Sequence, residues 1–182
     1  MIAQKQILLL SSLIVFSVAS IIFSLLSGSV DISATQLAKG IFSTEPSLNA
    51  QVLQEIRIPR TLAAFVTGGL LALSGAIMQV LLRNPLADPY ILGISGGAAV
   101  GALSAILVGA TGFWLSNAAF VGALSSIFLV FGIANKFGTW SVTRLLLTGV
   151  VVSAGWGAVI NILLTTSSTN NVQSMLFWLM GD

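Results

Sequence analysis

The sequence has 182 residues, of which 56% are hydrophobic and only 7% are charged. Soluble domains carry about 25% charged residues, so this chain lacks the polar coat of a water-facing surface, and most of it must lie in lipid. The net charge of +2 without a basic run argues against a nucleic-acid partner, and the absence of Cys and His excludes thiol chemistry, disulfides and the usual zinc ligands.

The first apolar run covers residues 7–26 and is the first expected membrane span. About twenty helical residues at about 1.5 Å each match the roughly 30 Å hydrocarbon core of a bilayer. The run is too long for the apolar region of a signal peptide, and no polar mature domain follows it.

Residues 28–60 form the longest expected loop, which we place outside the cell. A short amphipathic helix is predicted over Ser33–Lys39, capped by its first residue and lying on the membrane surface. A second helical piece is expected to begin at Asn49 as its cap. Pro59 is expected to hold Ile58 in an extended conformation and to open the next helix.

The second expected span covers residues 61–82 and ends at a charged turn. Small residues recur at every fourth position of this span, which favours close approach of another helix; they are Ala64, Gly68, Ala72 and Ala76. The turn contains two pairs that predict a sharp connection, Asn84-Pro85 and Asp88-Pro89.

Residues 91–134 contain no charge. As one helix they would measure about 65 Å, which is too long for one crossing and right for two. The break is expected at residues 110–117. A polar loop is then predicted over Thr165–Ser174, and the start of a sixth apolar segment over Met175–Gly181. The remaining expected spans are 91–109, 114–133 and 144–164.

The sequence therefore predicts an all-α, polytopic transmembrane helix bundle with about five complete spans and the start of a sixth. Basic residues are split four against three between alternate loops, so the positive-inside rule fixes the orientation only weakly. Because the side with four has the shorter loops, we expect it, and the N-terminus, to be cytoplasmic. Arg57 and Arg60 are then external.

Arg57 and Arg60 lie three residues apart where positive charge is disfavoured, and arginine offers a flat, five-donor fork that suits carboxylates. They are candidates for receiving acidic groups of an external partner. The alternatives are anchoring to lipid headgroups and internal pairing with Glu55.

A stripe of small and polar residues follows one face of the fifth span. Such a stripe lines a water-filled path or packs against another helix, and both readings stay open; its members are Gly149, Ser153, Gly157, Asn161 and Thr165. The glycine-rich run Ile91–Gly101 lacks the Lys-Ser/Thr of a phosphate loop. No carboxylates face one another within a span, so no catalytic or metal site and no cofactor is expected.

Several motifs together resemble the permease subunits of bacterial ABC importers for iron–siderophore complexes, haem and cobalamin. The resemblance covers nearly the whole chain in order, and the Asn-Pro-Leu-Ala-Asp-Pro turn is its most specific part. The motifs are Arg57-Ile-Pro-Arg-Thr61, Ser74-Gly-Ala76, Gln79, Arg83-Asn-Pro-Leu-Ala-Asp-Pro89, Leu92-Gly-Ile-Ser95 and Phe177-Trp-Leu-Met-Gly181.

The resemblance implies a multi-pass permease of the bacterial inner membrane with about ten helices, which is not itself an enzyme. Such permeases work in identical or paralogous pairs with two ATP-binding subunits. A periplasmic or lipoprotein substrate-binding protein docks outside and presents glutamates to arginines that match Arg57 and Arg60. The path lies between the two permeases, and the fifth helix contributes to its lining.

The family's chain is nearly twice as long, so residues 1–182 are expected to be the N-terminal half of a permease domain. Two other classes remain as alternatives. An ion-coupled secondary transporter would need a carboxylate or a broken helix at mid-bilayer, and neither is evident in the sequence. A non-transporting membrane assembly subunit would use the glycine stripes for packing alone.

Overall fold

The structure, a computed structural model, describes residues 2–28, 30, 32–37, 47–136 and 141–181. Every regular element in these ranges is a helix, which confirms the predicted all-α, polytopic fold. Within them, four stretches are long and apolar enough to cross a bilayer: Gln4–Leu26, Leu48–Leu82, Phe113–Asn135 and Val142–Thr166. The chain divides into two compact units, Met1–Leu73 and Ser74–Asp182.

The first unit begins with α1 (Ile2–Leu26) and a short helical turn at residues 34–37. Ser33 caps this turn. Its Oγ accepts the N–H of Gln36 at 3.3 Å, and its own N–H donates to Oε1 of Gln36 at 2.9 Å. The two bonds form a capping box. The predicted end of this helix at Lys39 lies outside the described residues.

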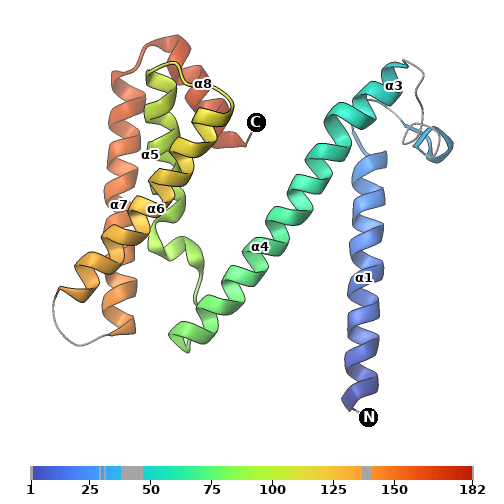
Figure 1. Cartoon of the computed structure of the whole chain (residues 1–182), viewed down its shortest axis with the longest axis horizontal. Helices are drawn as coiled ribbons and strands as arrows, with labels where there is room; N and C mark the ends of the chain where they lie inside the picture. Colours follow the sequence, from blue (N-terminus) through green and yellow to red (C-terminus); the bar gives the residue numbers. More distant parts are fainter. Residues whose placement is uncertain (1, 29, 31, 38–46, 137–140, 182) are drawn as a thin grey trace. The chain divides into compact units, whose positions relative to one another are not determined.

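The unit continues with α3 (Leu48–Gln51), a π-helix (Val52–Arg57) and the part of α4 (Ile58–Leu82) that ends at Leu73; these helices are drawn in cyan and green in Figure 1. Two predictions fail here. The cap is Ser47, whose side chain accepts the N–H of Ala50, and not Asn49. Ile58 is helical, with φ −62° and ψ −53°, and not extended.

The π-helix explains how a helical Ile58 precedes Pro59. In an α-helix the proline ring clashes with the carbonyl four residues earlier and lacks the N–H that would bond to it. Here the N–H of Ile58 reaches the carbonyl of Leu53, five residues back. The wider turn relieves the clash, so one continuous helical stretch of 35 residues runs to Leu82.

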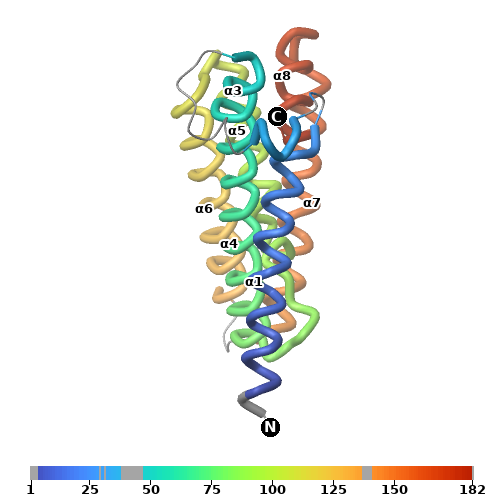
Figure 2. The backbone as a smooth tube through the Cα atoms, turned by 90° about the vertical axis from the view of Figure 1, so that its right-hand side faces the viewer, coloured from blue at the N-terminus to red at the C-terminus, as the bar shows by residue number. Residues whose placement is uncertain are grey.

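The second unit contains a 3₁₀-helix (Pro89–Leu92), α5 (Ile94–Leu107), α6 (Phe113–Asn135), α7 (Val142–Thr166) and α8 (Thr169–Met180). Figures 1 and 2 show α5, α6 and α7 side by side. With 14 residues, α5 is about 21 Å long. Within the predicted span 91–109, the α-helix thus covers residues 94–107, and Gly93 separates it from the 3₁₀-helix before it.

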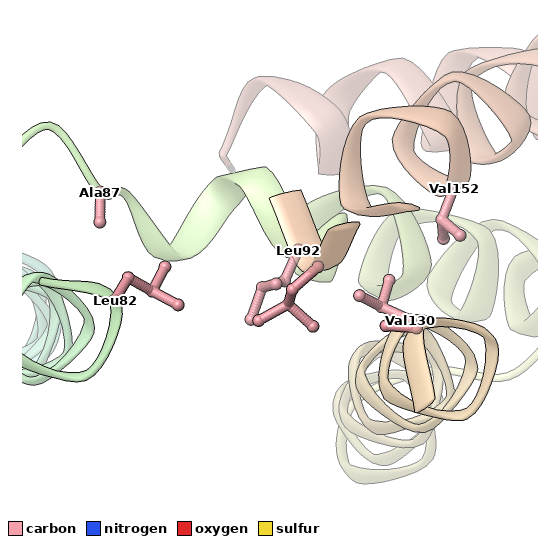
Figure 3. Close-up of a cluster of buried hydrophobic side chains, with 7 residues drawn as sticks. Leu82, Ala87, Leu92, Val130 and Val152 are labelled. Carbon is pink, nitrogen blue, oxygen red and sulfur yellow. The ribbon is translucent and has the colours of Figure 1, made fainter. Parts of the chain in front are cut away.

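The apolar core of this unit surrounds the turn between α4 and α5. Figure 3 shows that its side chains come from the end of α4, the turn, α6 and α7. They are Leu82, Ala87, Leu92, Val130, Ala134, Leu145 and Val152. This packing holds the non-helical backbone of the turn against two long helices.

The polar segment Thr165–Ser174 was predicted to be a loop, and this prediction is wrong. Only Ser167 and Ser168 separate α7 from α8, which begins at Thr169. Met175 is fully buried in the packing of α8. Because this apolar residue anchors the helix, the polar residues before it become its first turns instead of a wetted loop.

Candidate functional site

The two candidate arginines have different environments in the first unit. Arg60 is exposed, and the described residues provide it with no carboxylate partner. Arg57 is only 8% exposed. Its Nη1 donates to the carbonyls of Leu25 at 2.8 Å and Leu26 at 3.2 Å, and its Nη2 donates to the carbonyl of Val30. The two members of the expected docking pair are therefore not equivalent.

Both arginines line one cavity of about 500 Å³ in the first unit. Hydroxyl groups contribute to the same wall, and Oγ of Ser24 lies 2.9 Å from Oγ1 of Thr61, which joins α1 to α4. The cavity thus combines cationic and hydroxyl groups at the end of α1 and the beginning of α4. An anionic group fits this chemistry.

The turn after α4 contains two side-chain-capped turns, one formed by Asn84 and one by Asp88. Oδ1 of Asn84 accepts the N–H of Leu86 at 2.9 Å, and Oδ1 of Asp88 accepts the N–H of Tyr90 at 2.8 Å. Pro85 follows the first cap, and Pro89 opens the 3₁₀-helix after the second. The four motif residues thus act through backbone geometry.

A buried polar chain fixes the end of this turn to α6 and α7. The indole N–H of Trp156 donates to Oγ of Ser126 at 2.9 Å, and that hydroxyl donates to the carbonyl of Leu92 at 3.0 Å. Ser126 is fully buried. Gly93 follows with φ +70°, and a Cβ there would lie 3.0 Å from Oγ of both Ser126 and Ser153.

The predicted stripe on α7 divides into a packed part and an exposed part. Gly149 is buried, and a Cβ there would collide with the carbonyl of Ile91. Ser153 lies beside Gly93. The other three members lie further along α7. A Cβ on Gly157 would meet nothing within 4 Å, and the side chains of Asn161 and Thr165 are exposed. The first two positions thus serve helix packing.

Two helices of the second unit touch backbone to backbone. A Cβ on Gly97 would collide with the carbonyl oxygen of Gly122, and one on Gly101 with that of Ala118. The small residues on α5 therefore serve the close crossing of α5 and α6.

Sequence reasoning missed Ser126 and Trp156. A buried indole N–H usually has an acceptor, so a tryptophan between Gly155 and Gly157 was a usable signal for the first half of this pair. The serine carried no comparable signal, because the sequence does not distinguish Ser126 from its neighbour Ser125. In the structure, the hydroxyl of Ser125 bonds only within its own helix, to the carbonyl of Gly122.

Curated relatives share much of this sequence. A cobalamin import system permease protein of Halobacterium salinarum is 42% identical over 137 residues, which are 75% of this chain and 37% of the relative. The achromobactin transport system permease protein of Dickeya dadantii is 36% identical over 90% of this chain and 48% of its own length. The molybdate import system permease protein of Haemophilus influenzae is 32% identical over 96% of this chain and 53% of its own length.

A solved structure described as a metal-chelate type ABC transporter in an inward-facing conformation superposes with a TM-score of 0.79 at 31% identity. The match covers 96% of this chain and 53% of that one. The chain thus spans about half or less of the length of these relatives. Residues 13–182 match the FecCD transport family, and the chain belongs to that family.

Proposed function

We propose that this chain forms part of the permease subunit of an ABC importer in the cytoplasmic membrane. The observation that carries the proposal is the family match over residues 13–182, together with a helical fold shared with a metal-chelate type transporter. The cargo we propose is an iron–siderophore complex, haem or cobalamin. Separate ATP-binding subunits supply the energy, and a second permease subunit completes the path.

The docking site we propose lies at the Arg60 end of α4. A substrate-binding protein approaches from outside and presents a carboxylate to the exposed guanidinium of Arg60. The cavity beside it supports this role, because the described residues that line it include two arginines and no acid. Asn161 and Thr165 are the members of the α7 stripe that we propose for the path, since both are exposed.

Sidedness is the first test. The stretch from Leu48 to Leu82 is about 52 Å long, so its two ends must lie on opposite sides of the bilayer. These 182 residues contain no cysteine, so they add no thiol background to single introduced cysteines. We expect an impermeant maleimide to label Leu48→Cys from outside, and Leu86→Cys only after the cytoplasmic membrane is opened. Both side chains are exposed, at 71% and 84%.

The reverse labelling pattern would place Arg60 in the cytoplasm and overturn external docking. Labelling of both thiols from the same side would contradict the crossing itself. Each variant is first tested after complete permeabilisation, where both thiols must react.

Charge reversal at Arg60 tests the docking proposal. In the assembled transporter, Arg60→Glu is expected to weaken binding of the substrate-binding protein by about tenfold, because attraction to a carboxylate becomes repulsion. The loss should shrink as salt is raised, since exposed charges are screened. Affinity is measured by surface plasmon resonance at several ionic strengths.

Lys5→Glu is the matched control. It changes charge by the same amount at the opposite end of α1, where the side chain is also exposed. Docking should be unchanged by it. Equal affinities of the Arg60→Glu variant and the unmodified transporter would refute the assignment of Arg60.

A further inference from the structure

Arg57 closes the carboxyl end of α1. The last four carbonyls of a helix have no partner within the helix, and a cation there also interacts favourably with the helix dipole. The guanidinium of Arg57 meets both needs, since Nη1 donates to the carbonyls of Leu25 and Leu26. Its Nη2 extends the cap to the carbonyl of Val30, beyond the helix end. One side chain from residue 57 thus binds three carbonyls of residues 25–30.

Gly28 gives this guanidinium its place. A Cβ on Gly28 would lie 2.5 Å from Nη2 of Arg57, 2.8 Å from Cζ and 3.1 Å from Nε. Any side chain at this position must therefore displace the planar fork. The fit explains why a charged residue is only 8% exposed here, with backbone carbonyls as its partners among the described residues.

The π-helix places Arg57 at this end of α1. Arg57 is the last residue of the π-helix, and Leu53 beneath it is 1% exposed. The next helical turn carries Arg60, which lines the same cavity but remains exposed. A second link lies beside the first, where the hydroxyls of Ser24 and Thr61 are 2.9 Å apart. The end of α1, the π-helix and the start of α4 are thus held together by polar contacts.

We propose that Arg57 is a positioning residue for the docking site. Its guanidinium group holds the end of α1 against the beginning of α4 and thereby determines the position of Arg60. The consequence for docking rests on the function proposed above, while the cap on α1 does not. The cap needs the planar, two-sided geometry of arginine, which the point charge of lysine does not reproduce.

Three variants separate positioning from direct docking. Arg57→Lys keeps the charge and loses the fork. Gly28→Ala keeps both arginines and displaces the fork. Gly69→Ala is the matched control, because a Cβ there meets nothing within 4 Å. Each is made in the assembled transporter, and only particles with the full set of subunits are analysed.

The first measurement is amide hydrogen exchange at the end of α1. Arg57→Lys and Gly28→Ala are each expected to accelerate exchange of the amides near residues 25–30 by about tenfold, because the cap on the carbonyls is lost. Gly69→Ala should leave the exchange of these amides unchanged. Unchanged exchange in both test variants would overturn the positioning role, whatever the result for docking.

The second measurement is the affinity of the substrate-binding protein and its dependence on salt. Both Arg57→Lys and Gly28→Ala should weaken docking by about tenfold with an unchanged salt slope, since no charge is removed. Full affinity in both variants alongside faster exchange near residues 25–30 would show that the cap does not position Arg60, and the proposal would be wrong. Weaker docking without faster exchange would mean that Arg57 contacts the partner directly, which would equally overturn the positioning role. If Arg60→Glu leaves docking intact, the proposed docking function fails. Faster exchange in Arg57→Lys and Gly28→Ala would in that case still show that Arg57 caps α1.

Discussion

Replacing Gly97 by alanine is expected to lower the stability of the second unit by about 1–3 kcal/mol, the range found for overpacked interiors. The new Cβ would collide with the carbonyl oxygen of Gly122. This atom belongs to the backbone of α6 and has no rotamer by which to move away, so α5 and α6 must separate. The effect is measured as the thermal unfolding midpoint of the protein in detergent.

Gly155→Ala is the control for this prediction. Gly155 lies in the interior of α7, and a Cβ there meets nothing within 4 Å. Alanine is the better helix former by about 0.8–1.0 kcal/mol, so this variant should keep or raise the midpoint. Equal midpoints for the two variants would show that the α5–α6 crossing tolerates a side chain and that the close contact is not required.

Removing the hydroxyl of Ser126 is expected to cause the second large loss of stability. Ser126→Ala leaves the indole N–H of the partly buried Trp156 without its acceptor and the carbonyl of Leu92 without its side-chain donor, at a position where Ser126 itself is fully buried. An unsatisfied buried polar group costs about 1–3 kcal/mol. We expect a loss of stability in this range, measured as the free energy of unfolding, and a looser turn before α5.

Two comparisons make the test specific. Ser125→Ala, one residue away, removes an exposed hydroxyl that bonds only within α6, and it should change stability by no more than about 0.5 kcal/mol. In a double-mutant cycle with Trp156→Phe, the two changes should couple by at least about 0.5 kcal/mol. Additive effects would mean that the indole and the hydroxyl stabilise the unit independently.

Hydropathy predicted the long helices because an apolar run of bilayer length has few other stable forms. The expected spans 7–26, 61–82, 114–133 and 144–164 each lie within an observed helix. The prediction for Ile58 failed for a local reason, a hydrogen bond to a residue only five positions earlier. Ile58 is helical because a π-helix absorbs the clash of Pro59, and a single-sequence rule for the residue before proline contains no such turn.

The candidate site was predictable in residue type and less so in role. Two arginines at the end of a span indicated a site for anionic groups, but their spacing did not reveal that Arg57 folds back on a helix about thirty residues earlier. The turn motif was evident from Asn84-Pro85 and Asp88-Pro89, since these pairs make capped turns locally. Ser126 and Trp156 are joined only by the fold, which brings α6 and α7 together.

The contact between the glycines of α5 and α6 has a mechanical consequence. Where main-chain atoms of two helices interlock without intervening side chains, sliding of one helix along the other would drive carbonyl oxygens into Cα atoms. We therefore expect α5 and α6 to travel as one stiff pair in any rearrangement of the second unit. We expect the short connections between helices, such as Ser167 and Ser168 between α7 and α8, to take up the deformation.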